Sequence, residues 1–202
     1  MTHGSDNIRT AVILAGGQSR RFGQDKCTFD IGGRPMIRIV YDTLRTVFDE
    51  VIIAGGDTAG LRELGLDSHP DPVAGKGALG GIYNGLLRSA STAVFVCGCD
   101  MPLIKPAAIR TVLQAAADED ILIPLIDGIR QPLHAVYRRT ILPSAERLAT
   151  QDNCYLPDLL GEVNVRYLEE ATFADVPDYA LSFVSLNDQD MVAQYRRHLE
   201  RL

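Results

Sequence analysis

The chain has 202 residues, of which 46% are hydrophobic and 23% are charged, and its formal net charge is −6. A chain of this length and composition can bury roughly 70% of its unfolded surface without a disulfide or a metal staple. The acidic balance excludes a broad nucleic-acid-binding surface, because proteins that track phosphate backbones carry a basic excess. We therefore expect one globular domain over residues 1–202, with its functional basic residues gathered locally.

The cysteines and the N-terminus are typical of a reducing compartment. Cys27, Cys97, Cys99 and Cys154 form no C-x-x-C pair, which disfavours a zinc site and favours reduced, buried thiols. Residues 1–10 lack the apolar core of a signal peptide, and no apolar stretch approaches the ~20 residues of a membrane span. We expect a cytoplasmic protein with no membrane partner.

Apolar periodicity predicts an alternation of strands and helices. In chain order, we expect a strand at 10–15, a helix at 35–48, a strand at 50–54, a helix at 79–90, a strand at 92–97 and a helix at 106–117. Strands at 120–125 and 131–137 and helices at 140–149 and 188–202 follow. Strands rich in Val and Ile that alternate with amphipathic helices predict an α/β sandwich with a mostly parallel sheet. Ligands of such sheets bind beyond the carboxyl ends of the strands, so the loops after the first three strands are the informative ones.

The loop after the first strand, LAGGQSRRFGQDK, has the composition of a polyphosphate site. Gly16 and Gly17 allow backbone N–H groups to turn toward a ligand, and Arg20, Arg21 and Lys26 supply cations. The pattern is neither a P-loop nor G-x-G-x-x-G. The alternative is an ordinary glycine-rich turn with solvated arginines, but three cations in this position favour the phosphate site.

Asp100 follows the third strand directly. A carboxylate at the tip of a central strand is well placed to hold Mg²⁺ that arrives with phosphates, and Mg²⁺ takes only one or two protein carboxylates. The alternative is that Asp100 caps the helix near Pro106, although the gap is long for a cap. We therefore favour the metal role.

Two further candidates stay open on the residues alone. The glycine-rich segment 69–85 allows close approach to a flat ligand, and Asp71 within it is able to accept hydrogen bonds from the two N–H donors of guanine; a plain surface loop explains the composition equally well. His134 is a conceivable catalytic base, but a packed or surface histidine is the favoured interpretation.

The quoted motifs carry a family resemblance. LAGGQSRRFGQDK resembles the L-A-G-G-x-S-x-R-x-G-x-D-K signature of the MobA-like nucleotidyltransferases, which are related to sugar-phosphate nucleotidyltransferases and include molybdenum cofactor guanylyltransferases. KGALGGIYNGL, VFVCGCDMPLI, RQPLHAVY and FVSLNDQDM also resemble family segments, so the resemblance covers residues 9 to about 200. It implies a three-layer Rossmann-like sandwich of the nucleotide-diphospho-sugar transferase type.

The resemblance also implies roles for individual residues. The nucleotide would contact Leu14, Ala15, Gly16 and Gly17, with Gly17 marking members that use guanine. Arg20 and Lys26 would hold the triphosphate, Asp71 would read guanine, and Asp100 would bind Mg²⁺. The acceptor would contact Arg130, Gln131, Pro132 and Asn187.

The implied reaction is transfer of GMP from GTP to the terminal phosphate of Mo-molybdopterin, with release of pyrophosphate and with Arg20, Lys26 and Asp100 as the catalytic residues. Cofactor-delivery contacts with molybdoenzymes or their chaperones are the implied protein partners. The chain departs from the family pattern at Ala54 and Ser185, where asparagines are expected, and at Asp188, where threonine is expected. The alternatives are a cytidylyltransferase or guanylyltransferase with another phosphorylated acceptor, and a non-catalytic nucleotide-binding protein.

Overall fold

The computed structural model describes residues 8–16, 26–56, 58–73, 75–152 and 155–202. Gly17, Arg20, Arg21 and Cys154 lie outside these residues, so what the sequence predicts for them stays a prediction. Among the described residues, no helix is long and apolar enough to cross a bilayer.

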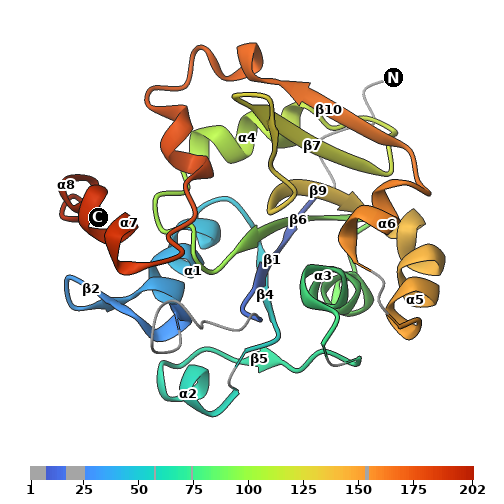
Figure 1. Ribbon diagram of the computed structural model, residues 1–202, viewed down its shortest axis with the longest axis horizontal. Coiled ribbons are helices and arrows are strands. Elements are labelled where there is room, and N and C mark those ends of the chain that lie inside the picture. The colour runs from blue at the N-terminus through green and yellow to red at the C-terminus, as the bar shows by residue number, and fades with distance from the viewer. Residues whose placement is uncertain (1–7, 17–25, 57, 74, 153–154) are drawn as a thin grey trace.

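One eight-stranded sheet runs through the middle of the molecule (Figure 1). Its strand order is β10-β7-β9-β6-β1-β4-β5. The eighth strand, β8, lies outside this order and pairs with the last residues of β7. The strands are β1 (Thr10–Leu14), β4 (Glu50–Ala54), β5 (Ser68–His69), β6 (Ala93–Gly98), β7 (Ile121–Ile126), β8 (Ile129–Arg130), β9 (His134–Arg138) and β10 (Val165–Glu169). Only β8 and β9 pair antiparallel to their neighbours, so the predicted mostly parallel sheet is confirmed.

Helices cover both faces of the sheet, which confirms the three-layer architecture (Figure 1). The α-helices are α1 (Met36–Arg45), α2 (Thr58–Glu63), α3 (Gly77–Arg88), α4 (Pro106–Ala115), α5 (Leu142–Thr150), α6 (Leu156–Leu160), α7 (Gln189–Gln194) and α8 (Arg196–Leu199). Short 3₁₀ turns are η1 (Lys26–Thr28), η2 (Arg139–Ile141), η3 (Glu170–Phe173) and η4 (Tyr179–Phe183).

The alternation of side chains along β1 divides the core into two layers. Ala11 and Ile13 pack in the cluster that holds α1 and α4, whereas Val12 and Leu14 pack in the cluster that holds α3 and α5. All five residues of β1 are buried, as expected for a central strand covered on both faces. The loop after β1 therefore starts from a strand that is buried on both faces.

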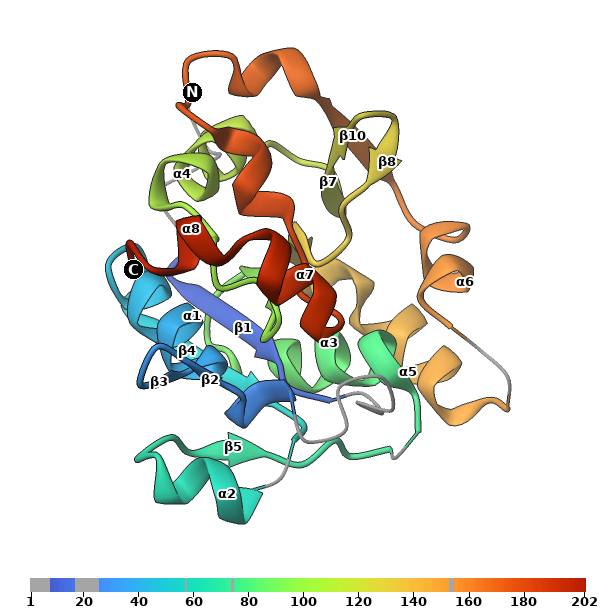
Figure 2. The same cartoon turned by 60° about the vertical axis from the view of Figure 1, so that its left-hand side comes forward.

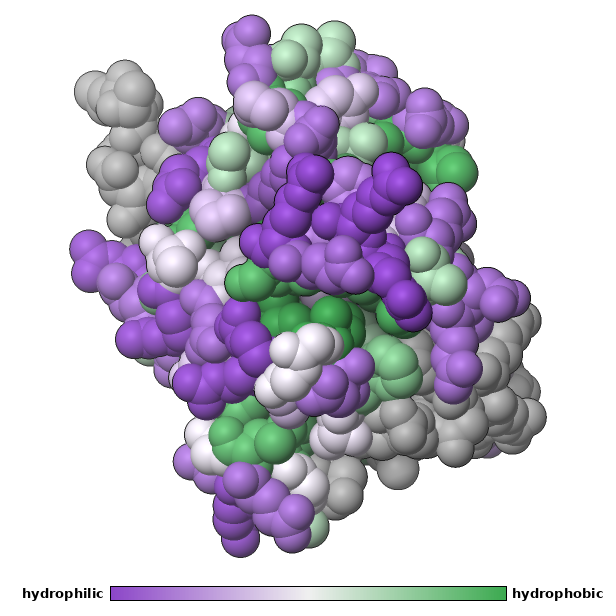
Figure 3. All heavy atoms as spheres, turned by 90° about the vertical axis from the view of Figure 1, so that its left-hand side faces the viewer, coloured by the Kyte–Doolittle hydropathy of each residue, from purple (hydrophilic) through white to green (hydrophobic). Residues whose placement is uncertain are grey.

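A third, smaller cluster joins the C-terminal segment to the hairpin of β2 (Asp30–Ile31) and β3 (Arg34–Pro35), which lies beside α1 (Figure 2). Ile31, Leu186 and Leu199 are buried in it. Figure 3 shows apolar residues gathered on the face that carries the C-terminal helices, under a group of hydrophilic side chains. The cluster fixes the path of the chain between η4 and α8.

The structure corrects several sequence boundaries. The strand expected at 131–137 begins only at His134, because residues 131–134 turn and the His134 N–H donates to the Gln131 carbonyl at 3.1 Å. The helix expected at 188–202 is interrupted at Tyr195, whose φ of −94° and ψ of 8° separate α7 from α8. The short elements β2, β3, β5, β8, β10, α2 and α6 were not expected, since two to six residues carry little periodicity.

Glycines in α3 allow this helix to lie directly on the sheet. A Cβ on Gly85 would lie 2.6 Å from both methyl carbons of Val12, and a Cβ on Gly81 would lie 2.8 Å from Leu14 Cδ2. Such distances are far below van der Waals contact, so these positions require glycine in spite of its low helix propensity. The helix is thereby held close to the end of β1.

We expect Gly85→Ala to lower the free energy of unfolding by about 1–3 kcal/mol, the usual cost of overpacking, although alanine is the better helix former. Denaturant unfolding measures the change. Gly161→Ala is the matched control, because φ there is −77° and its nearest contact would be an ordinary 3.4 Å. Equal stability of Gly85→Ala and the wild type would contradict the close packing of α3 on β1.

Candidate functional site

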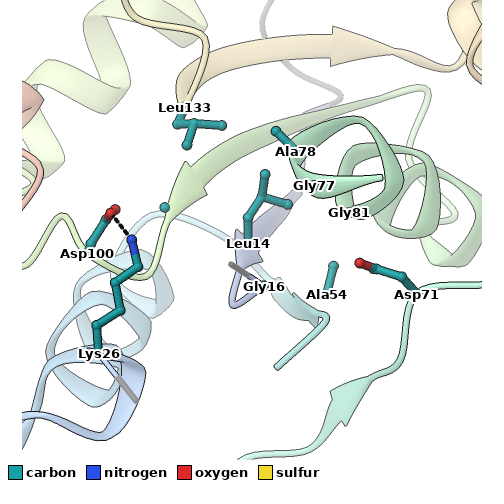
Figure 4. Close-up of a pocket in the computed structure, with 11 residues that line it drawn as sticks. Leu14, Gly16, Lys26, Ala54, Asp71, Gly77, Ala78, Gly81, Asp100 and Leu133 are labelled. Atoms are coloured by element: carbon teal, nitrogen blue, oxygen red, sulfur yellow. Dashed lines mark hydrogen bonds and ion pairs between the residues drawn. The ribbon is translucent and has the colours of Figure 1, made fainter. Parts of the chain in front are cut away.

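A cavity of about 240 Å³ opens at the carboxyl ends of β1, β4 and β6. Of the site residues predicted from sequence, it brings together Leu14, Gly16, Lys26, Asp71 and Asp100 (Figure 4). The remaining lining residues are Ala54, Gly77, Ala78, Gly81, Gly98 and Leu133. Residues from distant parts of the chain meet here because β1 lies between β4 and β6 in the sheet.

One end of the cavity is defined by an ion pair. Lys26 Nζ lies 2.5 Å from Asp100 Oδ2, and the two side chains are only 19% and 7% exposed. Burial by itself lowers the pKa of the Lys26 ammonium, but attraction to Asp100 and their hydrogen bond outweigh burial, so that the pKa is raised. Lys26 therefore stays positively charged beside the Asp100 carboxylate.

The backbone around Asp100 is fixed from two sides. The Cys99 N–H donates to the Leu14 carbonyl at 3.1 Å, and the Leu186 N–H donates to the Asp100 carbonyl at 2.8 Å. A Cβ on Gly98 would lie 2.3 Å from Asp100 Oδ1, so the carboxylate folds back over a glycine. Lys105, rather than Asp100, is the N-cap residue of α4, so the capping alternative is wrong.

The other end of the cavity carries Asp71 (Figure 4). Burial raises the pKa of the Asp71 carboxyl, and a hydrogen bond from Asn84 acts in the opposite direction. Asn84 Nδ2 donates to Asp71 Oδ1 at 3.2 Å and to the His69 carbonyl at 3.0 Å, which ties the 69–71 segment to α3. The segment is therefore anchored at Asp71, unlike a plain surface loop.

Sequence reasoning missed Asn84, which is 1% exposed. The available signal was a lone amide in the apolar stretch GIYNGLL of a predicted helix, where a buried polar side chain needs a partner.

Ala15 differs from its neighbours, because it is not among the residues that line the cavity. Its N–H donates to the Ala54 carbonyl at 2.9 Å and its carbonyl accepts from Cys27 Sγ at 3.4 Å.

The four predicted acceptor residues lie outside this cavity. Arg130 is exposed on β8, with its guanidinium carbon 5.1 Å from the ring centroid of Tyr167. The Pro132 carbonyl accepts a hydrogen bond from Tyr137, and Asn187 is exposed in the tail. Gln131 lines a second cavity, although Leu133, two residues further on, lines the first.

Three cysteines lie under the site. Cys27, Cys97 and Cys99 are buried thiols, as expected, and Cys27 Sγ donates to Cys99 Sγ at 2.8 Å. Burial raises the pKa of the Cys97 thiol well above its usual range. These thiols behave as small apolar side chains that support the loops carrying Lys26 and Asp100.

His134 is packed, as favoured, and is the first residue of the internal strand β9. It is fully buried, its ring stands edge-on to Phe95 at 5.0 Å, and Nε2 lies 3.0 Å from Ser182 Oγ. Among the described residues, Nδ1 has no hydrogen-bond partner. Burial lowers the pKa of His134 to about 3, against a smaller opposing effect of a backbone hydrogen bond. The neutral ring anchors η4 to β9.

A mostly parallel sheet with a cavity and a lysine–aspartate pair at the carboxyl ends of its strands defines an α/β protein of the kind that binds ligands at this edge. The model of the family described as MobA-like NTP transferase domain matches residues 11–163. The chain belongs to this family of nucleotidyltransferases.

Relatives cover most of the chain. A probable molybdenum cofactor guanylyltransferase of Pelotomaculum thermopropionicum is 38% identical over 88% of this chain and 87% of its own length. A molybdenum cofactor guanylyltransferase of Desulfosudis oleivorans is 32% identical over 90% of this chain and 91% of its own. The crystal structure of molybdopterin-guanine dinucleotide biosynthesis protein A from Archaeoglobus fulgidus has the same fold, with a TM-score of 0.82 at 24% identity over 96% of this chain and all of that one.

The buried neutral His134 predicts an acid-dependent loss of stability. Between pH 6.5 and about pH 3, His134 binds a proton in the unfolded chain but stays neutral in the folded chain. Acid therefore favours unfolding in this window. Between pH 6.5 and 5 we expect this residue to lower the free energy of unfolding by about 2 kcal/mol. Denaturant unfolding of the wild type and of His134→Phe at several pH values measures this loss of stability. If the stability of His134→Phe depends on pH as strongly as that of the wild type, the prediction is contradicted.

Proposed function

We propose that this chain transfers GMP from GTP to the terminal phosphate of Mo-molybdopterin and releases pyrophosphate. The observation that carries the proposal is a single cavity with a buried Lys26–Asp100 pair at one end and Asp71 at the other. A nucleoside triphosphate has the matching shape, with a polyanion at one end and a hydrogen-bonding base at the other. The names of the relatives supply guanine and the molybdenum cofactor as the specific chemistry.

The site fits a divalent cation carried by the nucleotide. Asp100 already has a cationic group, the Lys26 ammonium, against its carboxylate oxygen, and Mg²⁺ prefers such oxygen ligands. Mg²⁺ bound there would neutralise phosphate charge. Asp100 would be the protein ligand, and Lys26 would turn from the carboxylate to the triphosphate.

The reaction asks the protein to bring two anions together. An oxygen of the acceptor's terminal phosphate forms a bond to the α-phosphorus of GTP, and the bond from that phosphorus to the bridging oxygen breaks. The electron pair of the broken bond leaves with pyrophosphate. Since the attacking oxygen is already anionic near neutral pH, no general base is needed, and buried His134 has no part in the step.

Lys26 supplies stabilisation where charge accumulates. Its ammonium, kept protonated by its surroundings, would lie beside the leaving pyrophosphate, and Arg20 is proposed to act with it. Asp71 would accept hydrogen bonds from the guanine ring N–H and amino group, with Asn84 fixing the orientation of the carboxylate. Leu14, Ala15, Gly16 and Gly17 remain the proposed nucleotide contacts of the loop.

The acceptor is proposed to lie along the same edge of the sheet, near Arg130, Gln131, Pro132 and Asn187. A single domain in the cytoplasm, with delivery contacts to molybdoenzymes or their chaperones, completes the proposal. The second candidate is a transferase of the same fold that uses CTP or another acceptor. Ala54, where the family pattern has asparagine, lines the cavity that would hold the base. This departure from the family pattern is the observation that favours the second candidate.

We expect Lys26→Ala and Asp100→Ala each to lower turnover by roughly 10²–10³-fold, about 3–4 kcal/mol of transition-state stabilisation, while the fold persists. Pyrophosphate release from GTP in the presence of the acceptor measures the loss. Lys105→Ala is the matched control, because that lysine makes an exposed ion pair with Asp178 away from the cavity. Near-normal turnover of folded Asp100→Ala would remove the proposed metal role.

Base choice is tested independently of catalysis. Mg·GTP at 100 times its Kd is expected to stabilise the wild type by about 2.7 kcal/mol in thermal unfolding, and Mg·CTP at the same concentration much less. Asp71→Asn keeps the shape but replaces one accepting oxygen by a donor, so the preference for GTP should disappear. A larger shift with CTP in the wild type would favour the second candidate.

A further inference from the structure

Two buried thiols meet next to the residues of the ion pair. Cys27 Sγ lies 2.8 Å from Cys99 Sγ, although the two residues are 72 positions apart in the chain. Cys27 lies in η1 directly after Lys26, and Cys99 lies between the end of β6 and Asp100. Each thiol is therefore one residue away from a member of the Lys26–Asp100 pair.

The two sulfurs are placed almost as in a covalent pair. A disulfide holds its sulfurs about 2.05 Å apart, so Cys27 Sγ and Cys99 Sγ would need to approach by only about 0.8 Å. Both residues are 1% exposed, which keeps the pair away from large reagents and leaves access to small ones. The fold thus brings together two segments that a single new bond would join.

The surroundings of the pair slow its reaction with an oxidant. The hydrogen bond with Cys27 and burial raise the pKa of the Cys99 thiol, whereas the nearby Lys26 ammonium acts in the opposite direction. A thiol that stays protonated reacts slowly, because the thiolate is the nucleophile. Slow reaction suits a pair that stays reduced in ordinary conditions and responds to a sustained excess of oxidant.

We propose that Cys27 and Cys99 form a reversible disulfide, with hydrogen peroxide as the oxidant, and that this disulfide prevents nucleotide binding in the adjacent cavity. One sulfur loses its proton and bonds to a peroxide oxygen, the O–O bond breaks, and a sulfenic acid and water result. The second sulfur then bonds to the first, the S–O bond breaks, and a second water leaves. Two thiols and one peroxide thereby give one disulfide and two waters, with two electrons passing from sulfur to peroxide.

The disulfide would act on the cavity through the neighbours of both cysteines. It would tie η1 to the segment after β6, so that Lys26 is held beside Asp100 instead of turning to the triphosphate. Cys27 would also lose the S–H that donates to the Ala15 carbonyl at 3.4 Å, a contact of the loop that leads to Gly16. This consequence rests on the proposed function, since it concerns the nucleotide.

The test compares the full chain before and after treatment with hydrogen peroxide. Tryptic peptides separated without reductant should show residues 27–38 linked to residues 89–110 after oxidation. The Kd for Mg·GTP, obtained from thermal stabilisation within each redox form, should rise at least about tenfold. Dithiothreitol should reverse both changes, which it would not do for oxidised methionine.

Two variants separate the pair from general oxidative damage. Cys99→Ala keeps the contact between Cys27 and Ala15 but should give no link to residues 27–38, and its Kd for Mg·GTP should be unchanged by peroxide. Cys97→Ala is the matched control, because Cys97 is an equally buried thiol in the same tryptic peptide. This variant should still form the link and lose nucleotide binding. Circular dichroism checks that both variants fold.

Three results would overturn the proposal: no link between Cys27 and Cys99 in the oxidised wild type, a link to Cys154 in its place, or a link that leaves the Kd for Mg·GTP unchanged. The outcome is separable from the proposed function, because the link is detected without nucleotide. If the link forms as expected but the reduced chain does not bind Mg·GTP, the proposed function fails while the disulfide site stands. If the reduced chain transfers GMP and no link forms, the disulfide proposal fails alone.

Discussion

The buried ion pair between Lys26 and Asp100 is the interaction on which the site depends. It joins residues 74 positions apart, one after β1 and one after β6, which are hydrogen-bonded neighbours in the sheet. Burying two charges costs several kcal/mol of solvation per ion, which their attraction repays only in good geometry. A buried ion pair is therefore weak evidence of a contribution to stability. Its position in the cavity agrees with the binding role proposed for it.

Several features of the fold serve this pair. The missing side chain of Gly98 leaves room for the Asp100 carboxylate, and the cysteines beneath the two loops fill the space without competing charges. The tail contributes through the Leu186 N–H, and His134 holds η4 in its place through Ser182. The C-terminal segment, far from both strands in sequence, is thereby connected to the cavity.

Much of the fold and part of the site were predictable from sequence for one reason. A parallel sheet gathers the ends of its strands at a single edge, so polar residues directly after apolar runs are expected to meet. Lys26 and Asp100 were found in this way, whereas Asp71 was found from the glycine-rich segment that contains it. All three line one cavity. The binding roles assigned to them remain predictions.

The rest depends on packing that local patterns do not encode. Asn84 acquires its importance only when α3 lies against the 69–71 segment. The second cavity is formed by residues from two separate segments of the chain, 126–131 and 180–195. Tyr195 separates α7 from α8, although the periodicity predicted one continuous helix. Residues of both helices pack in the third cluster. The boundary at His134 was misjudged for a similar reason, since a turn replaces the first residues of the expected strand.

The most direct measurement follows the α-phosphate. The chain is incubated with GTP labelled at the α-phosphorus, Mg²⁺ and Mo-molybdopterin, and the label and the released phosphate species are quantified together. The account predicts that the label appears on the pterin product, with one pyrophosphate released for each labelled product. Release of inorganic phosphate alone, or pyrophosphate without label on the pterin, would contradict it.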